Sequence, residues 1–264
     1  LKPEVPEPWT PIKVSSEQSA VNSQKAEIVE VLGRKYVFSG LPVPAQMEST
    51  PIRLSEAEPE KKSQALLAGP MEIKLFTGGK EIAWECKQFK KTKESPSSVV
   101  FESENSAAGM VLKGKTTVEF DGMVRVDLQL APQAQDTPAE VERLDLVIPF
   151  RPEIAELMST YRKAPGPGKV IDRYLGKVPA EPWKNPVFYA QFIGTGKIGL
   201  EWFCDSMKGW RVKKGDEAVE VTRHKDRVLE TFHLVDHLVK IKADAPLAIT
   251  FGLIATPTKP LRKG

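Results

Sequence analysis

The stretch Val118–Leu130, VEFDGMVRVDLQL, decides the fold class because it has the pattern of two strands joined by a tight turn. Apolar and polar residues alternate on both sides of an Asp-Gly pair, and alternation with a period of two is typical of half-buried strands. An Asp-Gly pair between two such runs predicts a β-hairpin. We therefore expect at least this part of the chain to be an antiparallel sheet.

The length of the loop determines which side chains of the hairpin face the core. A two-residue loop would pair Val118 with Arg125 and place the arginine on the core face, so we reject it. A three-residue loop, residues 120–122, pairs Val118 with Val124, and the apolar residues then all face one way. Gly122 would take the left-handed bulge position, which glycine fills at low cost. One unbroken strand through Gly122 keeps the same parity and is the alternative.

Two carboxylates in this stretch, Glu119 and Asp121, raise the question of an acid/base pair. On either model of the loop, Glu119 points away from the core. Aspartate beside glycine is also the usual composition of a turn. We interpret the pair as structural.

Composition favours a single all-β domain. The chain has 264 residues, and all-β domains reach about 250 residues as single units. Its 22 prolines are about 8% of the residues, above the typical figure of about 5%. Proline is excluded from helix interiors and interrupts strands, so this content argues against long helices.

Charge and leader patterns exclude several classes of protein. The net charge is +3, from 38 basic and 35 acidic residues that are interleaved along the chain. This balance predicts neither a nucleic-acid partner nor binding to an anionic membrane. The sequence shows no signal-peptide core and no transmembrane run. Because it opens at LKPEVPEPW, we expect that a leader has been cleaved or the sequence trimmed.

The rest of the chain has strand patterns roughly every 8–14 residues. Residues 1–25 are proline-rich and predict an extended N-terminal segment with one short strand near PIKV. Residues 26–264 predict one large antiparallel β-sandwich of the supersandwich kind, with sheets about 10 Å apart. Hairpins are expected at Gly33-Arg34 and at Gly78-Gly79, the latter followed by the strand KEIAWEC. The helical candidate is RPEIAELMSTYRKA, residues 151–164, and the fold allows at most one or two short helices.

The second informative stretch is Gly196–Trp210, GKIGLEWFCDSMKGW, which supplies the candidate site residues. One parity holds apolar residues and the other holds Phe203 between Glu201 and Asp205. Aromatic rings stack on the apolar faces of sugars while carboxylates bind sugar hydroxyls, and aromatics are also enriched at interfaces. An inter-sheet contact or plain surface remains an alternative for Phe203. The candidates for a carbohydrate site or a domain interface are Glu201, Trp202, Phe203, Asp205 and Trp210.

Other motifs predict neither a cofactor nor a metal. GTGKIG and APGPGK both lack the Gly-Lys-Ser/Thr of a phosphate-binding loop. His233 and His237 are four residues apart, but their surroundings predict strand, turn and strand, and no HExxH motif is present. Cys86 and Cys204 have no zinc-site spacing, so we expect free buried thiols, with one disulfide as the alternative. No Gly-x-Ser-x-Gly nucleophile motif occurs, and we assign no catalytic residue.

Seven segments resemble, in this order, the N-terminal β-sandwich region of large bacterial glycoside-hydrolase-like proteins of uncharacterised function. They are GRKYVF, LPVPAQMES, LLAGPMEI, VEFDGMVRVDLQL, LDLVIPF, GKIGLEWFCDSMKGW and ITFGLIATPTKPL. Such proteins are similar in plan to the β-N-acetylgalactosaminidases that carry a sandwich ahead of a catalytic barrel. The resemblance runs from Gly33 to Leu261, with Phe120 standing where a tyrosine is expected.

The resemblance implies a domain fragment. A catalytic (β/α)₈ barrel would begin just after ATPTKPL and carry the catalytic acids, so none is transferred to this chain. It implies an accessory sandwich that packs against this C-terminal barrel in cis and helps shape its cleft, in a secreted or periplasmic protein. We expect Trp202, Phe203, Asp205 and Trp210 to be exposed and close together, and an apolar patch to mark the lost contact.

Three functions remain open from the sequence. The first is the accessory domain of a glycoside hydrolase, and the second is an autonomous carbohydrate-binding module for an oligosaccharide or polysaccharide. The third is an enzyme in its own right, which would require two facing carboxylates in a deep pocket. No residue pattern in the sequence favours the third.

Overall fold

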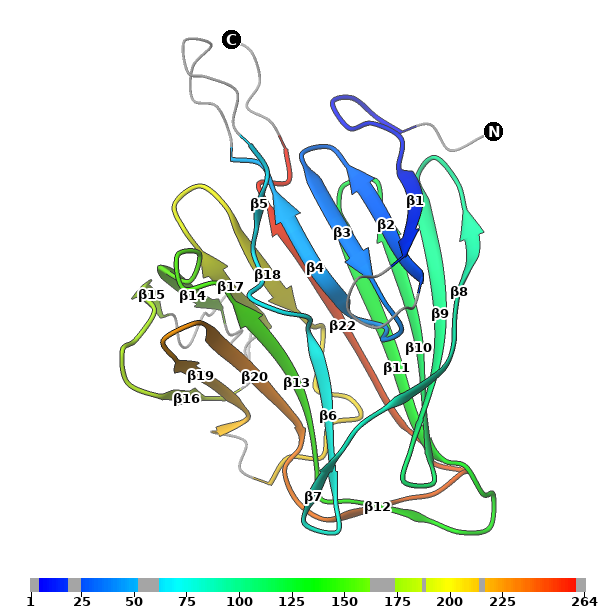
Figure 1. Ribbon diagram of the computed structural model, residues 1–264. Helices are drawn as coiled ribbons and strands as arrows, with labels where there is room; N and C mark the ends of the chain where they lie inside the picture. Colours follow the sequence, from blue (N-terminus) through cyan, green and yellow to red (C-terminus); the bar gives the residue numbers. More distant parts are fainter. Residues whose placement is uncertain are drawn as a thin grey trace, which may run out of the picture.

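The computed structural model describes residues 5–18, 25–51, 62–161, 174–186, 189–213 and 217–259. These residues form 22 β-strands and no α-helix, and the named strands pair antiparallel with one another (Figure 1). The predicted all-β fold is therefore confirmed. None of the described residues belongs to a helix long and apolar enough to cross a membrane.

The largest sheet has nine strands. Their order across the sheet is β15 (Leu175–Lys177), β14 (Leu157–Tyr161), β17 (Ala190–Gly194), β18 (Gly199–Phe203), β22 (Leu247–Thr256), β11 (Met123–Pro132), β10 (Met110–Glu119), β9 (Ser98–Ala107) and β8 (Glu85–Glu94).

Three smaller sheets accompany it. The five-stranded sheet has the order β1 (Lys13–Gln18), β2 (Lys25–Val31), β3 (Arg34–Phe38), β4 (Pro44–Ser49) and β5 (Gln64–Ala65). The six-stranded sheet has the order β16 (Trp183–Asn185), β19 (Val219–Arg223), β20 (Val228–Val235), β13 (Arg143–Phe150), β6 (Glu72–Thr77) and β7 (Lys80–Ile82). Strands β12 (Ala139–Val141) and β21 (Val239–Ile241) form a separate pair.

The five- and six-stranded sheets pack on the same face of the nine-stranded sheet, and both lie in front of it in Figure 1. Phe38 of β3 contacts Phe101 of β9 with ring centroids 5.4 Å apart. Trp202 of β18 stacks on Phe232 of β20 at 4.1 Å. The inner face of the large sheet is therefore the core, and its other face is left open.

The hairpin Val118–Leu130 has the register that its alternation predicts. Val118 pairs with Val124, both are fully buried, and residues 120–122 form the loop. Gly122 has a φ of 83° and donates its N–H to the carbonyl of Glu119 at 2.8 Å. The Asp121 carboxylate accepts the Met123 N–H at 3.0 Å, which is a turn-forming role.

Two further hairpins have their turns at or next to the predicted glycines. Gly78 and Gly79 join β6 to β7 with φ angles of 59° and 71°, which confirms the predicted Gly-Gly turn. The turn between β2 and β3 is Leu32-Gly33, because Val31 pairs with Arg34. It lies one residue earlier than the predicted Gly33-Arg34 turn.

The predicted helix at residues 151–164 is wrong over residues 151–161, and residues 162–164 lie outside the described part of the chain. Within residues 151–161 only one turn forms, in which the N–H groups of Ile154 and Ala155 both donate to the Arg151 carbonyl at 3.0 Å. The chain then enters β14, where Met158 pairs with Ile193 of β17 and is fully buried. Strand pairing overrides the local helical spacing here.

The predicted strand KEIAWEC is also wrong as a single element. Its first residues belong to β7 in the six-stranded sheet, and its last residues open β8 in the nine-stranded sheet. Between the two, the Trp84 indole N–H donates to the Ile73 carbonyl at 2.6 Å. This bond holds the chain where it crosses between sheets.

A buried arginine fastens the Val118–Leu130 hairpin to the five-stranded sheet. Arg34 is only 3% exposed, and its guanidinium donates to the carbonyls of Asp121 at 2.5 Å and Thr258 at 3.1 Å. The Tyr36 hydroxyl donates to the Gly122 carbonyl at 2.8 Å, and burial raises the pKa of Tyr36 to about 12. The loop is therefore held by both its own turn and these tertiary bonds.

Substituting Gly122 tests this anchoring. A Cβ at position 122 would lie 2.3 Å from the Arg34 Nη1 and 2.9 Å from the Tyr36 hydroxyl, on a backbone of positive φ. We expect Gly122→Ala to lower the free energy of unfolding by about 3 kcal/mol, measured by urea denaturation.

Gly79→Ala is the matched control, because Gly79 has a similar φ of 71° but open space around its Cα. We expect this control to lose only about 1 kcal/mol, the cost of the strained backbone. Equal losses in the two variants would contradict the role of the Arg34 and Tyr36 contacts.

Candidate functional site

The open face of the nine-stranded sheet carries a groove of about 950 Å³. Side chains of β9, β10, β11 and β22 line it, and Phe203 at the end of β18 contributes a further part together with residues 204–206 and 208. We call this the sheet groove. It is a concave surface that also collects charged and aromatic side chains.

Charged residues cross the sheet groove in rows of alternating sign. Strand pairing sets Asp127 beside Lys115, Lys115 beside Glu102, and Glu102 beside Lys90. Opposite charges in neighbouring strands attract each other, so the register itself stabilises each row. The result is a polar face with no excess of one sign.

The second row has the same plan with glutamines at its ends. Gln129 pairs with Lys113, Lys113 with Glu104, and Glu104 with Gln88. Lys113 lies 3.8 Å from Glu104, and its side chain is 63% exposed. Exposed pairs of this kind add little stability, so these side chains remain free to meet a partner.

Arg125 and Asp127 form the best-defined polar contact in the sheet groove. The Arg125 Nε and Nη2 donate to the Asp127 carboxylate at 2.9–3.2 Å, and the Thr250 hydroxyl donates to it at 2.6 Å. Partial burial raises the pKa of Asp127, but these hydrogen bonds outweigh it and hold that pKa below its ordinary value. The hydrogen bonds to Asp127, together with attraction from Asp127, Asp205 and Glu119, raise the pKa of Arg125.

Two phenylalanine rings lie against glycines of the open face. A Cβ at Gly252 would be 2.2 Å from the Phe203 ring, and one at Gly199 would be 2.4 Å from the Phe192 ring. The rings therefore cover backbone that has no side chain of its own. Phe203 also lines the sheet groove, which places an aromatic surface beside its charged rows.

The structure divides the five predicted site residues between two faces. Glu201 and Phe203 point to the open side of the sheet and are half-buried, and Asp205 is exposed just beyond β18. Phe203 and Asp205 line the sheet groove. The parity read from the sequence is correct for these residues.

Trp202 and Trp210 are not exposed, so that expectation is wrong. Trp202 is fully buried and Trp210 is 6% exposed, with their ring centroids 6.2 Å apart. Trp202 has the inward parity of β18, and the chain turns Trp210 inward at Gly209, where φ is 90°. A Cβ at Gly209 would be 1.8 Å from the Ala248 carbonyl oxygen, so this approach requires glycine.

Burial raises the pKa of two outward glutamates, Glu201 and Glu119, the latter also through the nearby Asp121. They stand in one row, because Glu201 pairs with Ile254, which pairs with Met123 in the hairpin that contains Glu119. Three strand spacings separate their backbones, about 14 Å. Paired carboxyls of glycoside hydrolases are about 5–9.5 Å apart, and side chains of two other residues stand between these. They do not form such a pair.

Sequence reasoning missed Arg125, Asp127, Lys115 and Thr250 as site residues. The signal was present in the alternation of the Val118–Leu130 stretch, whose outward positions are as regular as its inward ones. What the sequence lacked was the partner strand, since Thr250 of β22 pairs with Asp127 across 123 residues.

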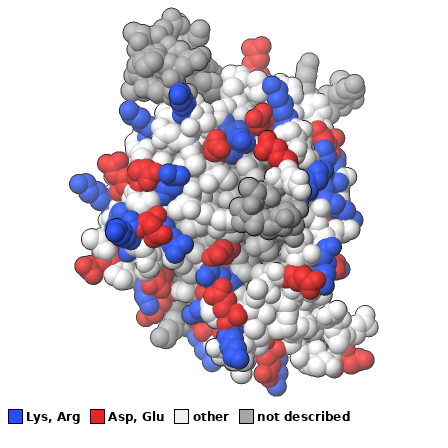
Figure 2. Space-filling model, in the orientation of Figure 1, with Lys and Arg blue, Asp and Glu red and all other residues white. Residues whose placement is uncertain are grey.

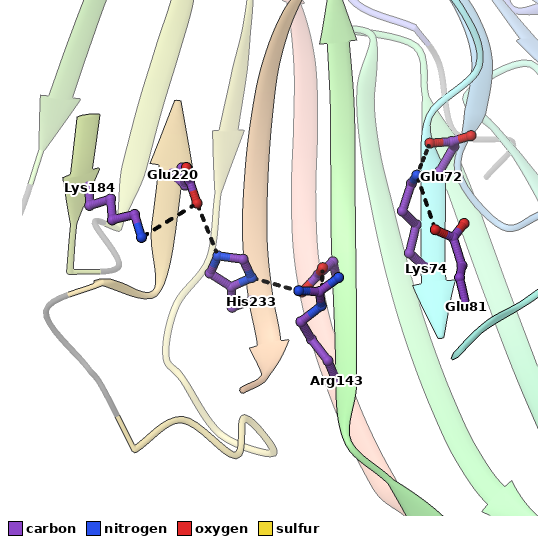
Figure 3. A network of polar contacts seen from close by, with 8 residues as sticks. Glu72, Lys74, Glu81, Arg143, Lys184, Glu220 and His233 are labelled. Carbon is purple, nitrogen blue, oxygen red and sulfur yellow. Dashed lines mark hydrogen bonds and ion pairs between the residues drawn. The ribbon is translucent and has the colours of Figure 1, made fainter. Parts of the chain in front are cut away.

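A second polar cluster lies on the outer face of the six-stranded sheet. His233 Nδ1 is 2.8 Å from Asp145 and its Nε2 is 3.8 Å from Glu220, while Arg143 bonds the other oxygen of Asp145 at 3.0 Å. Figure 3 shows the His233 ring lying between these two sides, with Lys184 beyond Glu220. Figure 2 shows basic and acidic side chains interspersed over the face in view. We interpret the cluster as a surface ion-pair network.

The remaining candidates for chemistry have ordinary environments. In the part of the chain that the structure describes, no group of three or more His, Cys, Asp or Glu side chains could hold a metal ion. His237 contacts its neighbour Asp236 at 2.7 Å. Cys86 and Cys204 are free thiols, and burial raises the pKa of Cys204 to about 12. A thiol with so high a pKa is a poor nucleophile.

One family model matches the chain. It is described as glycoside hydrolase 123, third domain, and it matches residues 21–201, more than half of the chain. The match includes β9, β10 and β11 of the sheet groove and ends within β18. No curated protein matches the sequence.

Solved structures also resemble the chain. The galactose mutarotase related enzyme from Lactobacillus acidophilus has a TM-score of 0.49 and 8% identity, covering 90% of this chain and 100% of that one. Galactose 1-epimerase from Lactobacillus acidophilus NCFM has a TM-score of 0.48 and 9% identity, covering 93% and 98% respectively.

The contact between Arg125 and Asp127 is tested by titration. We expect Arg125→Met to raise the pKa of the Asp127 carboxyl, because burial then acts without the guanidinium. Thr250→Val removes one neutral hydrogen bond and should raise that pKa by less. Carboxyl NMR chemical shifts followed with pH measure both. An unchanged Asp127 pKa in Arg125→Met would contradict the assigned contact.

Proposed function

This chain belongs to the glycoside hydrolase 123 third-domain family, and we propose that it is a non-catalytic accessory domain that packs against the catalytic barrel of its parent enzyme and helps shape the substrate cleft. The observation that carries the proposal is the sheet groove, a concave surface whose strand carboxylates, Glu102, Glu104 and Asp127, are each paired with a lysine in a neighbouring strand. Its residues can position a partner or a ligand, and the resemblance implies that the catalytic acids lie in the barrel.

The polarity of the sheet groove suits a contact within one chain. Interfaces between domains of a chain are more polar than those of obligate oligomers, and the rows of alternating charge fit that description. Four large hydrophobic residues are exposed in the described chain, and they come from separate segments: Leu175, Tyr189, Met207 and Leu238. The expected apolar patch is therefore not the basis of the proposal.

The proposed partner is a C-terminal (β/α)₈ barrel in cis. The family description numbers this domain as the third, so its position ahead of the barrel is part of the proposal and rests on the resemblance of its segments. A parent enzyme that degrades polymeric sugars would work outside the cytoplasm, and we place it in the periplasm or among secreted proteins.

The alternative is an autonomous carbohydrate-binding module. Phe203 favours it, because this ring lines the sheet groove close to Asp205 and to the Arg125–Asp127 pair. Ligand sites commonly combine an aromatic surface with a few well-placed polar groups. The Glu201 side chain, directly opposite Phe192 in the neighbouring strand, extends this surface.

Charge reversal in the full-length parent tests the accessory role. We expect Lys113→Glu to lower kcat/KM on a glycoside substrate about tenfold, because the variant reverses the charge that the sheet groove presents to the proposed barrel at this position. Lys240→Glu is the matched control, since Lys240 is 67% exposed and pairs with one glutamate as Lys113 does, but on the β12–β21 pair. Equal activity in the two variants would overturn the assignment of the sheet groove as the contact.

Titration of this chain with a panel of oligosaccharides decides the alternative. For an accessory domain we expect no heat of binding in isothermal titration calorimetry. Binding that Phe203→Ala abolishes, with the fold intact by circular dichroism, would establish the carbohydrate-binding module instead. Hydrolysis of a chromogenic glycoside by this chain would refute both.

A further inference from the structure

The interior of the sandwich contains a group of polar atoms that the protein does not satisfy. The side chains of Gln191, Trp202, Trp210 and Glu230 are at most 6% exposed. Both amide atoms of Gln191, the two indole N–H groups and the Glu230 Oε1 have no hydrogen-bond partner among the described residues. Buried polar groups are almost always hydrogen-bonded, so this group calls for a partner.

The four side chains are neighbours, although they come from three strands and a loop. Gln191 of β17 pairs directly with Trp202 of β18, and both face the core. Trp202 packs edge-on against Trp210 and stacks on Phe232. Glu230 precedes Phe232 by two residues on β20 and therefore shares its face.

Together these groups offer both donors and acceptors at one place. The indole nitrogens donate, the carboxyl oxygen accepts, and the Gln191 amide does both. A buried water typically makes about three hydrogen bonds to such groups. An apolar ligand could not satisfy them, and a charged one would meet no counter-ion.

Glu230 has no charged partner in its surroundings. Its cross-strand neighbours are Ile148 of β13 and Val221 of β19, which are both buried and apolar. Thr160 of β14 is the cross-strand neighbour of Gln191 in the nine-stranded sheet; it is uncharged, and its hydroxyl already accepts the Tyr174 N–H. Strands β13, β19 and β20 also carry the titratable residues of the polar cluster. These residues, Asp145, Glu220 and His233, lie on the outer face of the six-stranded sheet.

We propose that this region is a buried hydration site, bounded by Gln191, Trp202, Trp210 and Glu230, in which the Glu230 side chain is an uncharged carboxylic acid. One or more water molecules join the carboxyl to the amide and the indoles. Direct pairing between Glu230 and Gln191 does not suffice, since both amide atoms of Gln191 lack a partner.

A neutral Glu230 makes the stability of the domain depend on pH. Burial raises the pKa of Glu230 from 4.5 to about 8, and the nearby Gln191 amide offsets part of this effect. The folded protein thus keeps a proton that the unfolded chain releases above pH 4.5. Folding is most favoured below this pH, and the advantage is lost as the pH rises towards 8. Within that window the equilibrium constant for unfolding from this group increases up to tenfold per pH unit.

Urea denaturation between pH 5 and 8 tests the proposal. Glu230→Gln mimics the uncharged acid, so we expect it to fold and to lose the tenfold-per-unit pH dependence that the wild-type chain shows. Glu201→Gln is the control, because Glu201 is half-buried on the open face, and it should keep that dependence. Identical slopes for wild type and Glu230→Gln would overturn the neutral carboxyl.

Infrared spectroscopy keeps the proposal testable if Glu230→Gln does not fold. The wild-type chain at pH 6 should show the C=O stretch of one protonated carboxyl in an apolar setting, and its absence would refute the proposal. A high-resolution crystal structure tests the hydration. Ordered water within hydrogen-bond distance of Glu230 and an indole N–H is expected, and complete satisfaction of these atoms by protein groups alone would overturn it.

Discussion

The structure depends on burying one face of the nine-stranded sheet under two smaller sheets. Each large aliphatic or aromatic side chain moved from water into this layer contributes about 1.5–3 kcal/mol. Because strand side chains alternate, a shift of one residue would move the inward set to the open face. The register of the Val118–Leu130 hairpin is therefore fixed by its valines. Arg34 and Tyr36 then fasten its loop to the five-stranded sheet through backbone carbonyls.

Local sequence was enough to predict what local physics controls. The hairpin at Gly122, the Gly78-Gly79 turn and the outward parity of Phe203 all follow from alternation and from glycine's access to positive φ. The helix predicted at residues 151–164 was wrong because strand pairing with β17 outweighs the helical spacing of the apolar residues. The predicted exposure of Trp210 was wrong for a similar reason. The inward position of this side chain depends on the close approach of Gly209 to the Ala248 carbonyl of β22. Both errors arise from contacts between segments distant in sequence.

The candidate site divides in the same way. The outward direction of the site residues on β10 and β11 follows from the same alternation that predicts the core. The charged rows of the sheet groove, by contrast, form only when neighbouring strands pair in register. Thr250 shows this most clearly, because its bond to Asp127 joins strands 123 residues apart. The family match gives the family of this domain but does not identify a functional surface on it. The charged rows and the Phe203 ring therefore carry the functional argument.

Strands β17 and β18 link the two regions that this structure singles out. Along β18, Glu201 and Phe203 face the open side while Trp202 faces the interior, and along β17 Phe192 and Gln191 divide in the same way. The interior polar group and the Phe203 end of the sheet groove therefore share one backbone. Rings laid on Gly252 and Gly199 leave that backbone little room to move. A satisfied interior and a fixed groove are thus two requirements on the same pair of strands.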